Sequence, residues 1–305
     1  MKFFKAYLVI LLVATTISNS FTQQQAQFSM YMFNPLINNP AYAGSRDALS
    51  ITALGRKQWV GVSGAPETAT LSFHTPLRYE AIALGFSVLY DKIGPSQTTS
   101  FYGDVAYRFQ VSGKSKLSFG LKVGADIFGI NYTSLDATHQ WDNLYSNIPN
   151  KAYFNAGFGV YWYADNFYVG VSSPKVLENK FISTEDDNSK QVNHYLLNAG
   201  YSFEINSTFD IIPSFMVKAV PNTPLAIDAN VNLLLYDRIG FGAGYRFGDA
   251  VIANVLYHFS PKFRGGYAYD YTVSDFGRFN TGSHEIMVNY DLDFLGKGFP
   301  TPRRF

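Results

Sequence analysis

The chain of 305 residues contains no cysteine. This absence excludes a disulfide framework, a zinc site built on thiolates and a lipoprotein anchor, which needs a cysteine at the cleavage point. Charge is also scarce, since Asp, Glu, Lys and Arg make up 15% of the chain, against roughly 25% in soluble domains. The net charge is +1 and no basic cluster occurs, so nothing in the sequence attracts nucleic acid.

Long apolar runs are rare as well. Residues 6–17 form one, behind Lys2 and Lys5 and ahead of the small residues Ser20 and Thr22. This order predicts a secretory signal peptide over residues 1–22. The run is shorter than a membrane-spanning helix normally is, although an uncleaved anchor helix is an alternative.

Aromatic residues, by contrast, are abundant. They make up 17% of the chain, with 22 tyrosines and 27 phenylalanines. Weak hydropathy, little charge and many aromatics together are typical of a transmembrane β-barrel.

Apolar residues recur with a period of two in several segments, which predicts strands with one apolar face. The clearest segments are 115–128, 151–164, 191–206, 224–236 and 238–247. Charged residues in these segments fall on the face opposite the apolar set: Lys122, Asp126, Glu204, Asp228 and Arg246. A barrel must sort charges in this way because a lysine or arginine facing lipid near the midplane costs about 2–4 kcal/mol. A soluble sandwich gives the same alternation, but the density of Phe and Tyr on the apolar face favours the barrel.

We predict an all-β fold, namely a transmembrane antiparallel β-barrel of about 14 strands over residues 47–292. The expected strands are 47–57, 66–76, 81–91, 97–110, 115–128, 151–164, 166–173, 191–206, 208–219, 224–236, 238–247, 250–260, 262–272 and 281–292. Every second connection is short, as periplasmic turns are, and the long connections fall in the other set. This predicts both termini in the periplasm and a periplasmic tail over residues 293–305.

Glycine is frequent on the face expected to point inward, for example at Gly120, Gly159 and Gly242. These glycines either widen the lumen, permit strong curvature or mark the close approach of an internal plug. The sequence leaves these readings open.

No catalytic or metal-binding signature occurs. The five histidines show no metal-ligand spacing on one element, and no nucleophile motif is found. We therefore expect no enzyme activity and no cofactor.

Residues 23–46 do not follow the barrel pattern, because Pro35 and Pro40 interrupt any strand. We predict a plug-like or periplasmic segment. Its aromatic side chains must be shielded from water, either by the barrel itself or by a partner protein. Exposed aromatics on outer loops are further candidates for protein contact. The candidate partner-binding residues are Phe28, Tyr31, Phe33, Asn34, Pro35, Asn39, Pro40, Tyr42, Trp59, Trp141 and Tyr145.

The sequence resembles the PorP/SprF family of outer-membrane proteins from Bacteroidetes. The likeness is carried by Gln27-Phe28-Ser29 with Tyr31, Asn34-Pro35, Asn39 to Gly44, Arg56 with Gln58-Trp59, Pro66 with Thr68, Gly170 to Leu177, and Tyr245 to Val251. The resemblance implies an outer-membrane barrel that serves type IX protein secretion and gliding motility. It also implies partners: a secreted cell-surface adhesin or its C-terminal sorting domain, or a periplasmic ring protein of the machine, besides outer-membrane lipid. It provides no catalytic residues. The alternative function is a passive porin-like channel for small solutes.

Overall fold

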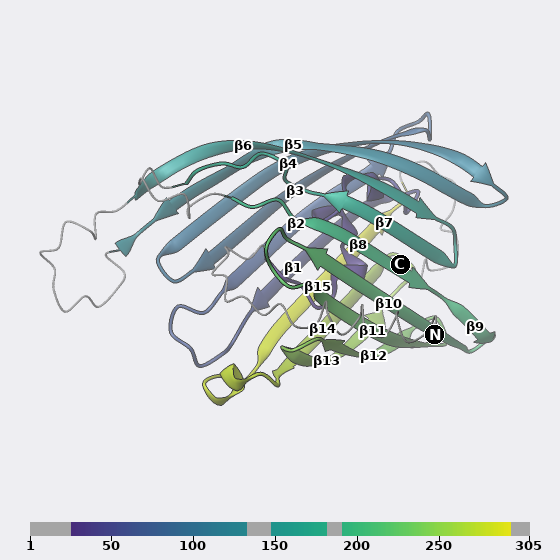
Figure 1. Ribbon diagram of the computed structural model, residues 1–305. Coiled ribbons are helices and arrows are strands. Elements are labelled where there is room, and N and C mark those ends of the chain that lie inside the picture. The colour runs from purple at the N-terminus through teal and green to yellow at the C-terminus, as the bar shows by residue number, and fades with distance from the viewer. Residues whose placement is uncertain (1–25, 133–147, 182–190, 294–305) are drawn as a thin grey trace, which may run out of the picture.

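The computed structural model describes residues 26–132, 148–181 and 191–293 (Figure 1). Its strands are β1 (Leu49–Lys57), β2 (Glu67–Pro76), β3 (Ile82–Ile93), β4 (Ser96–Ser112), β5 (Ser115–Ile130), β6 (Ile148–Tyr163), β7 (Phe167–Ser173), β8 (Tyr195–Tyr201), β9 (Phe203–Asn206), β10 (Phe209–Ala219), β11 (Ala226–Leu235), β12 (Ile239–Arg246), β13 (Ala250–His258), β14 (Phe263–Thr272) and β15 (Ser283–Leu292). No helix in these residues is long and apolar enough to cross a bilayer.

The strands form one closed antiparallel barrel. Each strand pairs with its neighbours in the chain, and β1 pairs with β15 along its whole length to close the sheet. β8 and β9 both pair with β10 and are the two halves of one wall strand, interrupted at Ser202. The wall therefore has 14 strands, and the predicted fold class is confirmed.

The two ends of the barrel differ in their connections. At one end, which we call the turn end, the connections are short: 77–81, 113–114, 164–166, 207–208, 236–238 and 259–262. The other end, which we call the loop end, carries the longer connections 58–66, 131–147, 174–194 and 273–282. Three shorter connections also lie there, and the last of the long ones contains the short helix η7 (Asp275–Arg278). Strands β4, β5 and β6 have 16 or 17 residues, so this wall is longer than the rest (Figure 1).

Side chains are sorted between the two faces of the wall as the alternation predicts. On β5, Leu121 and Val123 are 66% and 64% exposed on the outer face, whereas Lys122 is buried in the lumen. Asp126, Asp228 and Arg246 are likewise buried on the inner face. Glu204 differs because β9 lies at the turn end, where all four of its residues are exposed.

The outer face is expected to tolerate charge only near its ends. Replacing Leu121 with arginine, in the middle of β5, should lower the free energy of unfolding by about 2–4 kcal/mol, because the guanidinium would lie in the hydrocarbon core. Replacing Val111 with arginine, near the turn end of β4, should cost at most about 1 kcal/mol. Denaturant titration in lipid vesicles measures both values. Equal losses at the two positions would contradict the assignment of this face to lipid.

Candidate functional site

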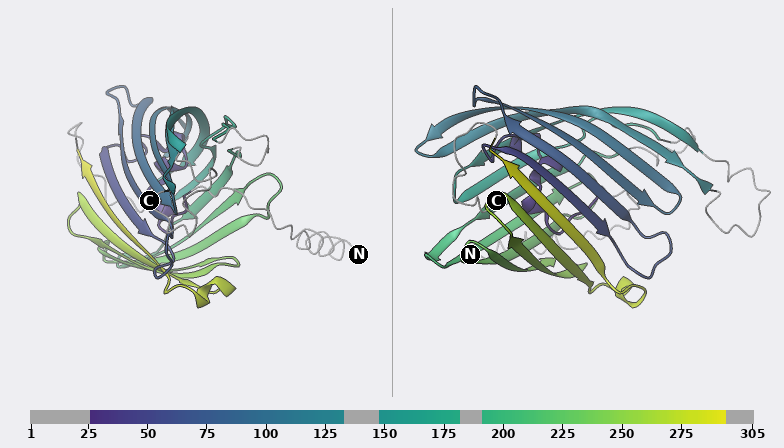
Figure 2. Two further views of the ribbon diagram at one scale, coloured as in Figure 1. Left: turned by 90° about the vertical axis from the view of Figure 1, so that its left-hand side faces the viewer. Right: turned by 180° about the vertical axis from the view of Figure 1, so that it is seen from behind.

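Residues 26–46 lie inside the barrel, and we call them the plug (Figures 1 and 2). They form three single-turn 3-10 helices: η1 (Tyr31–Phe33), η2 (Pro35–Ile37) and η3 (Pro40–Tyr42). Proline is favoured at the first position of such a turn because its φ angle is already fixed near the required value. The Asn39 side chain accepts a hydrogen bond from the backbone N–H of Ala41 and caps η3. Every residue from Phe28 to Arg46 is buried.

Two apolar clusters join the plug to the wall. In the first, Leu36, Ala41, Tyr42 and Ala43 pack against residues of β3, β4, β6, β7, β10 and β11. In the second, Phe28, Met30 to Phe33 and Ile37 pack against residues of β1, β10, β13, β14 and β15. Because the clusters reach strands on all sides, the plug fills the middle of the lumen.

Several inward glycines provide the space for the plug. A Cβ atom at Gly120 would overlap the backbone nitrogen of Ala41, and one at Gly159 would overlap the Asn39 amide. Other inward glycines have a different role, since Gly242 makes room for the amides of Asn232 and Asn254 on neighbouring strands. The expected close approach of a plug therefore holds at Gly120 and Gly159 and not at Gly242.

The plug crosses the lumen from the loop end to the turn end. Its first part contacts the loop-end halves of β1, β14 and β15, through Arg56, Asp270 and Glu285. Its last part contacts the turn end, where Arg46 forms an ion pair of 2.5 Å with Asp291. The chain then reverses direction and enters β1.

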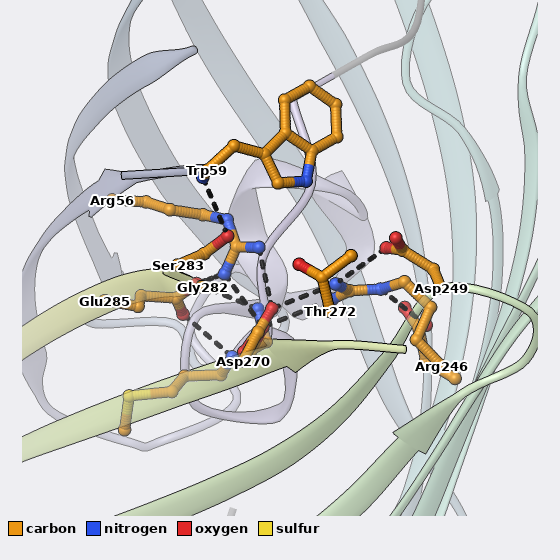
Figure 3. Close-up of polar contacts among 12 residues, drawn as sticks. Arg56, Trp59, Arg246, Asp249, Asp270, Thr272, Gly282, Ser283 and Glu285 are labelled. Carbon is orange, nitrogen blue, oxygen red and sulfur yellow. Dashed lines mark hydrogen bonds and ion pairs between the residues drawn. The ribbon is translucent and has the colours of Figure 1, made fainter. Parts of the chain in front are cut away.

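A cluster of ionic residues holds the loop-end part of the plug, and we call it the latch (Figure 3). It consists of Ser29 from the plug with Arg56, Asp228, Arg246, Asp270 and Glu285 from the wall, all buried. The Glu285 carboxylate accepts the backbone N–H groups of Ser29 and Met30 at 2.9 and 2.8 Å. The Ser29 hydroxyl donates to Asp270 at 2.7 Å and accepts from Arg56 at 2.8 Å.

Each charged group of the latch has an opposite charge within ion-pair distance, with three carboxylates sharing two guanidinium groups. Arg56 binds Asp270 at 2.7 Å and Glu285 at 2.9 Å. Arg246 binds Asp228 and Asp270, each at 2.9 Å. Buried ions are tolerated only when such partners replace the lost water. The latch is therefore sensitive to the loss of any one charge.

Further polar contacts hold the rest of the plug. The Lys122 ammonium donates to the backbone oxygens of Leu36 and Ile37 at 3.1 and 2.9 Å, and the Ser172 hydroxyl donates to the Asn38 oxygen at 2.8 Å. At the turn end, Arg108 donates to the backbone oxygen of Gly44. Contacts with the plug backbone do not depend on the plug side chains, so they fix its path through the lumen.

The tyrosine of η1 is neutral in this environment. Burial raises the pKa of Tyr31 to about 12. Its hydroxyl accepts a hydrogen bond from the Asn230 amide at 3.3 Å. The plug therefore adds no charge of its own at this point.

The structure separates the predicted partner-binding residues into three groups. Eight lie in the plug and are buried against the barrel's own wall: Phe28, Tyr31, Phe33, Asn34, Pro35, Asn39, Pro40 and Tyr42. Trp59 lies half-buried at the loop end, where its backbone N–H donates to Ser283 (Figure 3). Its ring meets that of Phe276 edge-on at 4.9 Å. Trp141 and Tyr145 lie outside the described residues.

Sequence reasoning did not single out Asp270 and Glu285. The alternation places both on inward faces, and a carboxylate that points into a barrel needs a partner there. Nothing local in the sequence identifies that partner as Ser29. Within the described ranges, no group of three or more His, Cys, Asp or Glu residues is arranged to hold a metal ion.

The closed barrel, its sorted faces and its two unlike ends define an outer-membrane β-barrel protein. Residues 20–290 match the family described as "Type IX secretion system membrane protein PorP/SprF", and the chain belongs to this family. No curated protein matches the chain.

Several solved structures are similar to the chain. The TodX deltaS2S3 mutant, a monoaromatic hydrocarbon channel, has a TM-score of 0.50 and 11% identity over 86% of this chain and 94% of its own. The CymD monoaromatic hydrocarbon channel has a TM-score of 0.49 and 12% identity over 91% and 95%. Omp33 of Acinetobacter baumannii has a TM-score of 0.45 and 13% identity over 81% and 98%. At such identities the likeness shows the fold alone.

Proposed function

We propose that the chain is a sealed accessory barrel of the type IX machinery, for secretion or for gliding. In this role it binds a cognate secreted adhesin through the adhesin's C-terminal domain, or binds a periplasmic component of the machine. The observation that carries this proposal is the plug, which fills the lumen with the chain's own residues. A barrel without an open pore is suited to anchoring and docking. We further propose that it has no enzyme activity.

The second candidate function is a passive solute channel, and the plug weighs against it. Apolar clusters and the ionic latch occupy the path that a solute would take. The plug also has many backbone contacts along its length. A channel would need the plug to leave its position.

For the orientation we propose that the turn end faces the periplasm, since outer-membrane barrels have short periplasmic turns. The last strand, β15, ends at the turn end, which supports a periplasmic carboxyl end. The direction of the plug argues against the periplasmic start of the chain that was expected from the sequence. Ala26 lines a recess at the loop end and would therefore lie on the outer side, not in the periplasm.

Purification of the tagged protein from native outer membranes in mild detergent tests the proposed function. We expect a protein with a type IX C-terminal sorting domain, or a ring component, to co-purify at a defined ratio. An equally tagged porin from the same cells is the control. The proposal would be overturned if the tagged barrel purified without any partner, as the control porin does.

A further inference from the structure

A recess of about 130 Å³ opens at the loop end, between the plug and the wall. Its apolar surface comes from Ala26 and Ile37 of the plug, Leu89 of β3, and Phe181 and Val192 of the β7–β8 connection. Phe181 is fixed in place because its ring stacks on Phe128 at 4.6 Å. The recess is therefore a formed cavity that faces the outer side in the proposed orientation.

The two lysines that line the recess already have partners. The Lys122 ammonium contacts two backbone oxygens of the plug and lies 3.6 Å from the Asp104 carboxylate. The Lys175 ammonium binds both oxygens of Asp126, at 2.9 and 2.8 Å. Asp126 also accepts hydrogen bonds from Ser100 and Tyr102. The charges of Lys122, Lys175 and Asp126 are therefore already bound by other groups of the protein.

Asp91 is different. Its side chain lines the recess, and its one hydrogen bond in the described part of the chain comes from the Thr68 hydroxyl, 2.6 Å from Oδ1. No ion pair of Asp91 occurs among the described residues. Counting Asp91, Asp104 and Asp126 against Lys122 and Lys175 gives three negative charges and two positive charges. The recess and its immediate partners therefore carry one uncompensated negative charge.

His194 supplies a second acceptor. Its Nδ1 lies 2.9 Å from the backbone oxygen of Val192, which can only accept, so Nδ1 carries the proton. In that tautomer the Nε2 atom of this recess-lining ring is an acceptor. Asp91 and His194 therefore both offer acceptors to the recess, among apolar side chains.

We propose that the recess binds a lysine side chain of a partner polypeptide, a proposal that rests on the proposed function and names the chemistry of the docked partner. The ammonium group binds the Asp91 carboxylate and His194 Nε2, and its methylene groups lie on Leu89, Ile37 and Phe181. The bound side chain touches the plug at Ile37.

The test uses purified mature protein and two acetylated, amidated peptides, Gly-Gly-Lys-Gly-Gly and the same peptide with norleucine in place of lysine. Calorimetry should show the lysine peptide binding at least about tenfold more tightly, the factor that one hydrogen-bonded charge supplies. Asp91→Asn should remove this preference. The matched control is Asp275→Asn, which removes a fully exposed carboxylate at the same end of the barrel. Equal affinity for both peptides, or an unchanged preference in Asp91→Asn, would overturn the proposal.

Carbodiimide cross-linking provides an independent measurement. The reagent activates a carboxyl group, which then forms an amide with a nearby amine, and mass spectrometry locates the bond. We expect the peptide lysine to be joined to Asp91. A bond from Asp91 to the protein's own α-amino group would show another occupant and would contradict a partner lysine. Failure of the peptide to bind, with partners still co-purifying from native membranes, would refute the recess and leave the proposed function standing.

Discussion

Replacing Arg56 with methionine should lower the free energy of unfolding by about 3–5 kcal/mol, because it leaves the buried Glu285 carboxylate without its cation and Asp270 with Arg246 alone. Arg56 binds both Asp270 and Glu285, and it also donates to the Ser29 hydroxyl. Methionine fills a similar volume, so the loss comes from charge and not from a cavity. Denaturant titration of the protein in vesicles measures the effect.

The adjacent residue provides the control. Lys57 is next in β1 and forms an ion pair with Glu67, but both side chains are more than half exposed. Exposed pairs contribute at most about 1 kcal/mol, so Lys57→Met should be nearly neutral. If the two variants lost stability equally, the latch would not be a buried ionic cluster.

The latch variant should also change the plug specifically. The backbone N–H groups of Ser29 and Met30 rely on the Glu285 carboxylate, which Arg56 holds in place through an ion pair. Without it, we expect amide hydrogen exchange to rise at Ser29 and Met30 before it rises in the strands. Uniform exchange across the barrel would instead indicate global destabilisation.

The sequence alone predicted the wall well, for a physical reason. A strand alternates its side chains between two faces, so a segment such as 151–164 reveals its two faces without any knowledge of its neighbours. The parity of the connections gave an independent check on the predicted number of about 14 strands. The division of the eighth strand at Ser202 was not predicted, because the register with β10 is the same on both sides of it and it leaves no mark on the alternation.

The plug and its latch were beyond such reasoning because they depend on distant contacts. The bond between Ser29 and Glu285 joins residues 256 positions apart. The prolines of the plug indicated that it could not be a strand. The sequence did not show whether the barrel or a partner protein packs against it, and the structure shows that the barrel does. The β7–β8 connection is a similar case: it was expected to be an outer loop, and Val176 returns to bond with Ala156 of β6.

The glycine contacts lead to the second main prediction. Replacing Gly120 with valine should expel the plug from its position and open the barrel. A Cβ atom there would overlap the backbone of Pro40 and Ala41, which cannot move aside as a flexible side chain can. A single extra methylene in a packed core costs about 1–3 kcal/mol, and valine adds three carbon atoms.

Planar-bilayer recording tests this prediction directly. The natural protein should show no steady conductance, and the Gly120→Val protein should show a stable open level. The control is Gly103→Val on β4, where the nearest atom to an added Cβ is the Val123 backbone oxygen at 4.0 Å. That variant should stay closed, since its new side chain faces away from the plug. Conductance in the natural protein, or a closed Gly120→Val barrel that still folds, would mean that the plug does not seal the lumen, and the solute channel would then become the stronger candidate.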